Sequence, residues 1–256
     1  MPERVVVDTI RPGVATVTLD RPERRNALSI ALLGSLVDSL AALARDGSTR
    51  VAILRGNGPV FSAGLDLAEA ARPDLVEASA RAVAAALRAL RRPELVTIAA
   101  LHGGVYAGGA GLAAACDVAI GTADLKIGFP EARRGLLPAL VCEVLRVKIR
   151  AGDLADLFLV GDPIDAVRAR EIGLVQRVVP PERLLDEAVA VAAGILAGGP
   201  DTIRRTKALL NETYAGHAAG DGDDHAIREH LEGRRSAEAD EGLRAFLEKR
   251  PPAWGA

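Results

Sequence analysis

Residues 105–117 read VYAGGAGLAAACD, and the glycines of this segment decide how the chain is interpreted. Within it, GAGLAA (109–114) fits G-x-G-x-x-[GA], the loop that holds a dinucleotide pyrophosphate at a helix N-terminus. That loop needs its first glycine directly after a strand. Here the apolar run LVTIAAL ends at Leu101, and residues 102–108 intervene. The match to a dinucleotide site is poor, which leaves two interpretations: close helix packing, or backbone N–H groups directed at a reacting atom.

A second glycine-containing loop favours the last interpretation. GPVFSAGLDL (58–67) follows another strand-like run, VAILRG (51–56), and Gly64 stands where the loop must turn. Two loops that follow strands and bend at glycine can direct two peptide N–H groups at one point. Such a pair is an oxyanion hole, which stabilises a carbonyl oxygen as it gains negative charge. A helix beginning near Gly109 would add the positive end of its dipole.

The remaining sequence alternates short strand-like runs with helical stretches, which predicts an α/β fold. Arg11-Pro12-Gly13 separates two apolar runs and predicts a hairpin turn. We expect a mixed core over residues 1–195 and a helical region over 196–256, with a polar loop at 216–225. The expected strands are 5–10, 14–19, 51–56, 95–101, 117–121, 125–129 and 174–179, and the expected helices are about 29–45, 74–91, 163–173, 181–197, 200–215 and 236–249.

The composition excludes several classes of protein. The 256 residues carry a net charge of -2 and 3% aromatic side chains, so the basic surface and stacking platforms of a nucleic-acid-binding protein are missing. MPERVVVDTI lacks the basic segment followed by an apolar one that marks a secretory signal. The sequence also has no run of about 18 apolar residues, the length that a membrane-spanning helix needs. Cys116 and Cys142 lack the spacing of metal ligands. We expect a cytoplasmic protein with no metal site and no membrane or nucleic-acid partner.

Several segments, in order along the chain, resemble the enoyl-CoA hydratase/isomerase (crotonase) superfamily. One glycine motif would be weak evidence, but collinear matches over nearly the whole chain are specific. The resemblance implies a crotonase-like spiral of ββα units, with a helical C-terminal trimerisation region in a homotrimer or homohexamer. The matching segments are VATVTLDRPERRNALS (14–29), FSAGLDL (61–67), HGGVYAGGAGLAAACD (102–117), GFPEARRGLLP (128–138), GDPIDAVRAREIGLVQRVVP (161–180) and EGLRAFLEKRPPAW (241–254).

The resemblance also implies catalytic roles for individual residues. The N–H groups of Leu65 and Gly108 would hold the oxygen of an acyl-CoA thioester. Family hydratases place two glutamates around the double bond, twenty residues apart. The second corresponds to Glu131 here, whereas the position of the first is Gly111, which cannot carry a proton. Glu131 is therefore the one matched acid/base, with the alternative that it is only a favourable charge at a helix N-terminus.

For the coenzyme A part of the substrate, the family's phosphate loop corresponds to residues 22–26. Arg24 or Arg25 would bind phosphate, unless both are ordinary solvated charges. Ala63 and Asp66 stand where the family holds adenine and shapes the loop. Phe246 and Lys249 match positions that reach the coenzyme A of a neighbouring subunit, or else belong to a plain amphipathic helix. No cofactor is implied beyond the coenzyme A of the substrate.

One carboxylate can move a proton between two carbons of a dienolate, so the sequence favours an enoyl-CoA isomerase. A hydratase or dehydratase that compensates for Gly111, and a non-catalytic acyl-CoA-binding protein, are the alternatives. After Pro138 the chain reads Ala139-Leu140-Val141, where many family hydratases have a glycine-rich turn. Bulkier side chains there would reshape the acyl pocket.

Overall fold

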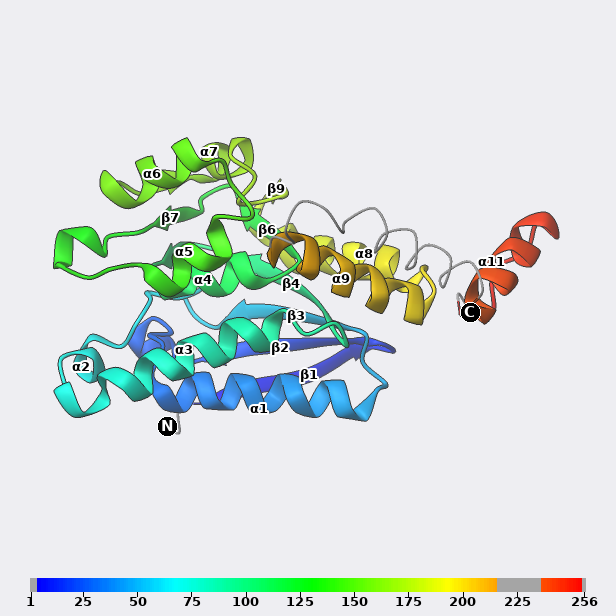
Figure 1. The fold of residues 1–256 in the computed structure, drawn as a ribbon, viewed down its shortest axis with the longest axis horizontal. Helices are drawn as coiled ribbons and strands as arrows, with labels where there is room; N and C mark the ends of the chain where they lie inside the picture. The colour runs from blue at the N-terminus through cyan, green and yellow to red at the C-terminus, as the bar shows by residue number, and fades with distance from the viewer. Residues whose placement is uncertain (1–3, 216–235, 255–256) are drawn as a thin grey trace. The chain divides into compact units, whose positions relative to one another are not determined.

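The computed structural model describes residues 4–215 and 236–254, and the chain divides into two compact units, Met1–Ala190 and Val191–Ala256 (Figure 1). The described strands are β1 (Arg4–Arg11), β2 (Val14–Asp20), β3 (Val51–Gly56), β4 (Val96–Leu101), β5 (Gly104–Tyr106), β6 (Val118–Thr122), β7 (Lys126–Gly128), β8 (Ile164–Asp165) and β9 (Arg177–Val179). The described helices are α1 (Ile30–Asp46), α2 (Leu67–Ala70), α3 (Val76–Leu90), α4 (Gly108–Ala115), α5 (Ala139–Leu145), α6 (Ala151–Leu159), α7 (Ala166–Glu171), α8 (Leu184–Leu196), α9 (Pro200–Ala215) and α11 (Ala237–Leu247), with short 3₁₀ turns η1 (Pro22–Arg24), η2 (Pro73–Leu75), η3 (Ala132–Arg134) and η4 (Pro181–Arg183).

The first unit is built on a six-stranded sheet with the order β1-β2-β3-β4-β6-β9. β1 and β2 form the predicted antiparallel hairpin, whose turn uses Gly13 at a φ of 78°. From β2 onward every neighbouring pair is parallel. Parallel strands need both faces covered, and β4 is accordingly buried along its whole length. The loops that leave β3 and β4 therefore start from adjacent strand ends.

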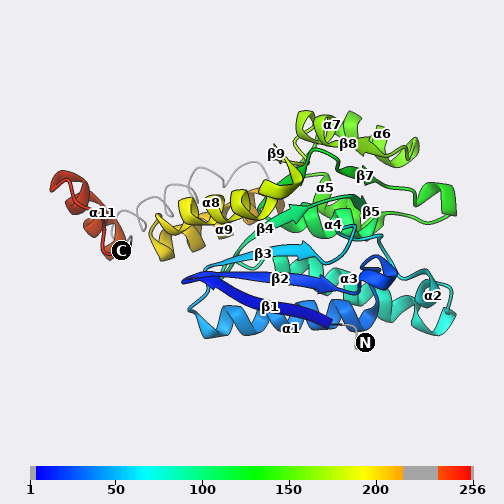
Figure 2. The same cartoon turned by 180° about the vertical axis from the view of Figure 1, so that it is seen from behind.

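Helices α1 and α3 lie side by side against the sheet, in front of it in Figure 1 and behind it in Figure 2. The predicted helix over 29–45 is confirmed, because Ser29 caps α1 by accepting a hydrogen bond of 3.1 Å from the N–H of Leu32. At its other end the helix stops at Gly47, whose φ is 69°. A leucine face of α1 is buried against the core.

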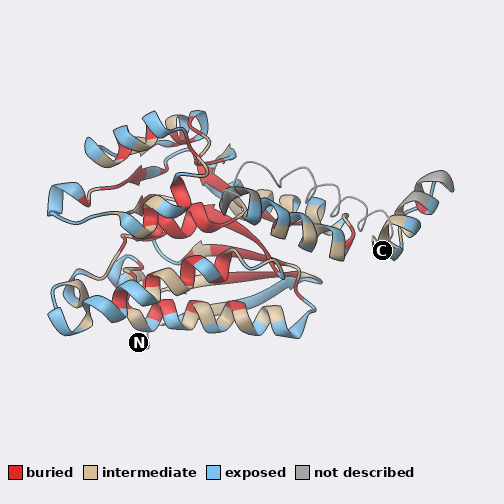
Figure 3. Ribbon diagram, in the orientation of Figure 1, coloured by how far each residue is buried: buried red, intermediate tan, exposed pale blue. Residues whose placement is uncertain are grey.

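Helix α4 is the most enclosed helix of the first unit, since all eight of its residues are buried (Figure 3). Its sequence, GGAGLAAA, offers almost no side-chain volume, so neighbouring elements approach its backbone closely. β5, which belongs to a small sheet with the order β5-β7-β8, directly precedes this helix.

Two details of the small sheet differ from the sequence prediction. β5 lies inside the glycine segment, which was treated as a loop. The expected helix over 163–173 is wrong at its start, because Ile164 pairs with Ile127 in β8 before α7 begins at Ala166. Pairings this short are decided by contacts distant in sequence.

The second unit is helical in its described residues, and the predicted helices over 200–215 and 236–249 are present as α9 and α11. Glu238 caps the start of α9, accepting hydrogen bonds from the N–H of Asp201 (2.7 Å) and of Thr202 (2.8 Å). The indole N–H of Trp254 donates to the carbonyl of Ala197. The predicted polar loop at 216–225 lies outside the described residues. In the described chain, no helix combines the length and apolarity needed to cross a membrane.

Candidate active site

The two glycine-containing loops run side by side as the sequence predicted. After β3 and β4 they pair through their backbones: the N–H of Phe61 donates to His102, the N–H of Ser62 to Gly104, and the N–H of Tyr106 to Ser62, at 3.0–3.3 Å. Ser62 and Val105 form a parallel bridge. Leu65 and Gly108 each stand three residues beyond that bridge, so the parallel pairing carries both to the same end of the two loops.

A close approach brings the loops together just before these two residues. Gly64 has a φ of 90°, and a methyl group placed on it would lie 2.9 Å from the Cβ of Ala107 and 3.0 Å from the carbonyl oxygen of Tyr106. Only glycine fits there without displacing the neighbour. Ala107 itself has a φ of 50° and a ψ of -120°, a conformation that residues other than glycine rarely adopt and that marks local strain.

Leu65 and Gly108 offer free backbone donors to a common pocket. No group of the described chain accepts a hydrogen bond from either N–H. Gly108 is also the first residue of α4, where the N–H groups of a helix have no partner in the preceding turn and the helix dipole is positive. Both residues line the same pocket. Two unpaired N–H groups on residues that line one cavity are suited to stabilise an oxyanion.

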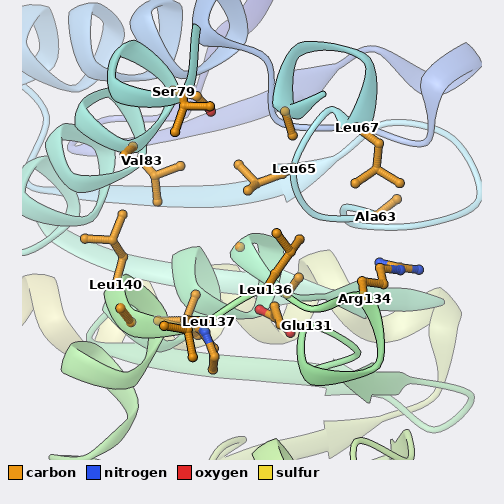
Figure 4. A pocket seen from close by; sticks show the side chains of 18 residues that line it. Ala63, Leu65, Leu67, Ser79, Val83, Glu131, Arg134, Leu136, Leu137 and Leu140 are labelled. Atoms are coloured by element: carbon orange, nitrogen blue, oxygen red, sulfur yellow. The ribbon is translucent and has the colours of Figure 1, made fainter. Parts of the chain in front are cut away.

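The pocket has a volume of about 380 Å³ and is mostly apolar. Figure 4 shows it between two walls, one with Leu65, Leu67, Ser79 and Val83 and the other with Glu131, Leu136, Leu137 and Leu140. Leu137 is 89% exposed, and Leu67 and Val76 are also exposed around the pocket. The full lining is Ala63, Leu65, Leu67, Ala70, Val76, Ser79, Ala80, Val83, Ala107, Gly108, Glu131, Arg134, Leu136, Leu137, Pro138, Ala139, Leu140 and Val141.

Glu131 supplies the one carboxylate among the residues that line this pocket. It follows β7 and Pro130, immediately before η3, and is 8% exposed. Its Oε2 is buried and has no hydrogen-bond partner in the described chain. Burial raises the pKa of the Glu131 carboxyl above its ordinary value, and its own backbone N–H and the positive charge of Arg134 partly oppose the rise. A carboxylate with a raised pKa and an unused oxygen is suited to accept and return a proton.

Gly111 lies on α4 one turn after Gly108 but does not line the pocket. A Cβ at this position would lie 3.1 Å from Cγ2 of Val141 on α5 and 3.7 Å from Cδ2 of Leu87 on α3. The position therefore offers no carboxylate, and a side chain there would contact Val141 closely. Glu143, on α5, is exposed and pairs with Arg146 at 3.0 Å.

A family model described as enoyl-CoA hydratase/isomerase matches residues 9–256. The chain belongs to this family. A protein of Thermus thermophilus, assigned by name to the enoyl-CoA hydratases, is 37% identical over 254 residues, which are 97% of this chain and 100% of the relative. The 2,3-dehydroadipyl-CoA hydratase of Escherichia coli is 32% identical and covers 93% of this chain and 94% of its own.

Solved structures agree with the family in fold. An enoyl-CoA hydratase of Mycobacterium smegmatis superposes with a TM-score of 0.92 at 32% identity, covering 98% of this chain and 99% of its own. An enoyl-CoA hydratase of Bacillus anthracis gives a TM-score of 0.92 at 30% identity, covering 99% of this chain and all of its own. The predicted α/β crotonase fold with a helical C-terminal region is therefore confirmed, and the chain is an enzyme of the enoyl-CoA hydratase/isomerase family.

The residues that the family resemblance assigns to coenzyme A lie in several places. Ala63 lines the pocket, and its N–H donates to the carbonyl of Arg25 at 2.9 Å, which places the 22–26 loop beside the pocket. Arg24 and Arg25 are both exposed. Lys249 is exposed in the second unit, at a φ of 53°. Phe246 belongs to α11, and its side chain lies outside the described residues.

The side chain of Asp66 is engaged in structural contacts, a helix cap and an ion pair. It caps α2 through the N–H groups of Ala68 and Glu69, and its Oδ2 lies 2.5 Å from Nη1 of Arg21. Both side chains are nearly buried, at 12% and 10% exposure. Burial alone would raise the pKa of Asp66, but the hydrogen bond from Arg21, the N–H groups of α2 and the positive charge lower it below the ordinary value.

Asn26 is a structural residue of the site that the sequence did not single out. Its buried side chain accepts from the N–H of Arg21 at 2.9 Å and donates to the carbonyls of Asn57, Val60 and Phe61 at 2.8–3.1 Å. It therefore fastens the 22–26 loop to the loop that carries Leu65. The available sequence signal was an asparagine in a turn, where its φ of 51° is well tolerated.

Proposed function

We propose that this enzyme is an enoyl-CoA isomerase that moves a double bond with Glu131 as its single acid/base. The observation that carries the proposal is one buried carboxylate, whose Oε2 has no hydrogen-bond partner in the described chain, in a mostly apolar pocket that Leu65 and Gly108 also line. Within residues 4–215 and 236–254 no other carboxylate lines that pocket, and Gly111 has no side chain to offer one.

The reaction would proceed through a dienolate. Glu131 removes a proton from C2 of a 3-enoyl thioester, and the electrons of that C–H bond delocalise onto the thioester oxygen. Leu65 and Gly108 stabilise the negative oxygen through their N–H groups. The proton then returns from Glu131 to C4, so the double bond ends between C2 and C3. One proton leaves and one is returned, so the reaction requires no redox group.

Binding and assembly complete the proposal. The thioester end of the substrate occupies the pocket, and the nucleotide end of coenzyme A lies near Ala63, with Arg24 or Arg25 on its phosphates. The helical region 196–256 assembles the chain into a trimer or a dimer of trimers, in which Phe246 and Lys249 would reach a neighbour's coenzyme A. Light scattering on the purified protein measures the assembly directly.

A second candidate is hydration of a 2-enoyl thioester, because the curated relatives named above are hydratases. Hydration adds a hydroxyl at C3 and a proton at C2, and loss of one general acid/base commonly costs about 10²–10⁴ in rate. A pocket that binds acyl-CoA without catalysis is a third candidate.

The deciding assay offers trans-3-enoyl-CoA and trans-2-enoyl-CoA to the wild type, to Glu131→Gln and to a matched control, Glu143→Gln. We expect isomerisation in the wild type and in Glu143→Gln, with a loss of about 10²–10⁴ in Glu131→Gln. Rapid hydration by the wild type that survives Glu131→Gln would refute the assigned base. No turnover of either substrate, with tight binding of butyryl-CoA, would establish the binder instead.

A further inference from the structure

The contact between Val141 and Gly111 joins two departures from the hydratase pattern that are thirty residues apart. Position 111 has no side chain where family hydratases carry their first glutamate, and Val141 is a branched residue in the segment after Pro138, where many family hydratases have a glycine-rich turn. In space the two meet: Cγ2 and Cγ1 of Val141 lie 3.1 and 3.5 Å from the point where a Cβ of residue 111 would stand. A contact of 3.1 Å is tighter than about nine in ten real Cβ contacts, so Val141 must shift by a few tenths of an ångström to admit a side chain at position 111.

Val141 also sets the chemistry of the pocket wall. It is 5% exposed, belongs to α5 and lines the pocket, whereas Gly111 does not. Its neighbours on this wall, Ala139 and Leu140, are apolar as well. A held water needs two to four polar partners, and the side chains that α5 contributes to this wall provide none, which leaves Glu131 as the carboxylate there (Figure 4). Ser79 and Glu131 lie on opposite walls (Figure 4).

We propose that Val141 is the residue that selects proton transfer over hydration. Its isopropyl group fills the space that a glutamate at position 111 would need, and it leaves C3 of a bound enoyl thioester without an activated water. The inference rests on the proposed function in one respect, namely that the thioester oxygen binds at Leu65 and Gly108. It makes Gly111 and Val141 a coupled pair, so that changing Gly111 alone does not restore hydration.

The test compares Gly111→Glu, Val141→Ala and the double variant for hydration of trans-2-enoyl-CoA. We expect each single variant to hydrate no faster than about threefold above the wild type, and the double variant to gain about 10²-fold or more, the range of one added general acid/base. Gly111→Glu combined with Leu140→Ala is the matched control. It shortens the adjacent wall residue, keeps Val141, and is expected to gain nothing.

Butyryl-CoA, which has no double bond to react, reports binding in every variant. The proposal is overturned if Gly111→Glu alone hydrates as fast as the double variant, or if the double variant binds butyryl-CoA and still gains no hydration. A separate measurement tests the proposed function itself: it fails if the wild type does not isomerise trans-3-enoyl-CoA.

A second measurement tests the packing without catalysis and without a buried charge. Alanine is favoured over glycine inside a helix, yet we expect Gly111→Ala to lower the thermal midpoint by about 2–4 °C because its methyl group meets Val141. In a Val141→Ala background the same change is expected to raise the midpoint. Equal shifts in the two backgrounds would show that residues 111 and 141 are not coupled and would overturn the inference.

Discussion

Gly64→Ala is the sharpest test of the backbone geometry at the oxyanion site. The added methyl group would stand 2.9 Å from the Cβ of Ala107 and 3.0 Å from the carbonyl of Tyr106, at a backbone φ of 90°. A non-glycine residue in a left-handed conformation costs about 1–2 kcal/mol, and the contact forces the two loops apart. Because Leu65 follows directly, its N–H moves away from the oxygen that it should bind.

Loss of one oxyanion donor costs about 3–4 kcal/mol in the transition state, which lowers kcat by about 10²–10³. The assay is isomerisation of trans-3-enoyl-CoA at saturating substrate, with thermal unfolding measured on the same samples. Gly47→Ala is the matched control, since Gly47 has a φ of 69° and no neighbour within 4 Å of the added methyl group. It should lose about 1–2 kcal/mol of stability and keep its kcat. If Gly64→Ala stays folded and its kcat remains within about threefold of the control, the backbone assignment is wrong.

Three further results are expected. Burial raises the pKa of Glu131, so the acid limb of kcat/KM should lie above the ordinary glutamate range. Glu131 then ionises at lower pH in the unfolded chain than in the folded one, so the free energy of unfolding should fall as pH rises from the unfolded to the folded pKa. Denaturant unfolding of Glu131→Gln should lack this pH dependence, and the same dependence in both proteins would contradict the assignment. Asn26→Ala should lower the free energy of unfolding by about 3 kcal/mol in denaturant titrations, because it leaves several buried backbone groups unpaired; a loss under about 1 kcal/mol would show that these bonds contribute little. Asp66→Ala should cost about 3–5 kcal/mol by removing the carboxylate that pairs with the nearly buried guanidinium of Arg21. Asp74→Ala, in an exposed pair, should cost at most about 1 kcal/mol, and equal losses in the two variants would refute the distinction.

Much of the fold was predictable because local signals and tertiary structure agree. The turn at Gly13, the capping serine of α1 and the glycine at its end each mark the boundary that the structure shows. The loop containing Gly64 was also predictable, since a bend after a strand requires a residue that tolerates positive φ. These features depend on a few neighbouring residues.

The unpredicted parts depend on contacts between distant segments. β5 and β8 are too short to have a pattern of their own and exist because β7 pairs with both. The sequence shows a glutamate at position 131 but not its unpartnered oxygen, which results from packing around η3. It likewise shows Gly111 and Val141 as separate departures, and only the packing of α5 on α4 reveals that one fills the space of the other.

The oxyanion site at Leu65 and Gly108 consists of peptide N–H groups, whereas the proton carrier is a side chain. This division has an evolutionary consequence. Every substitution of Leu65 except that by proline keeps the peptide donor, so activation of the thioester tolerates most mutations at that position. The side chains that decide proton transfer can change by single-nucleotide substitution. A glycine codon can differ by one base from a glutamate codon, and by one base from a valine codon. A protein with this fold can therefore retain its binding of the thioester while substitutions at positions 111, 131 and 141 change the reaction that it catalyses.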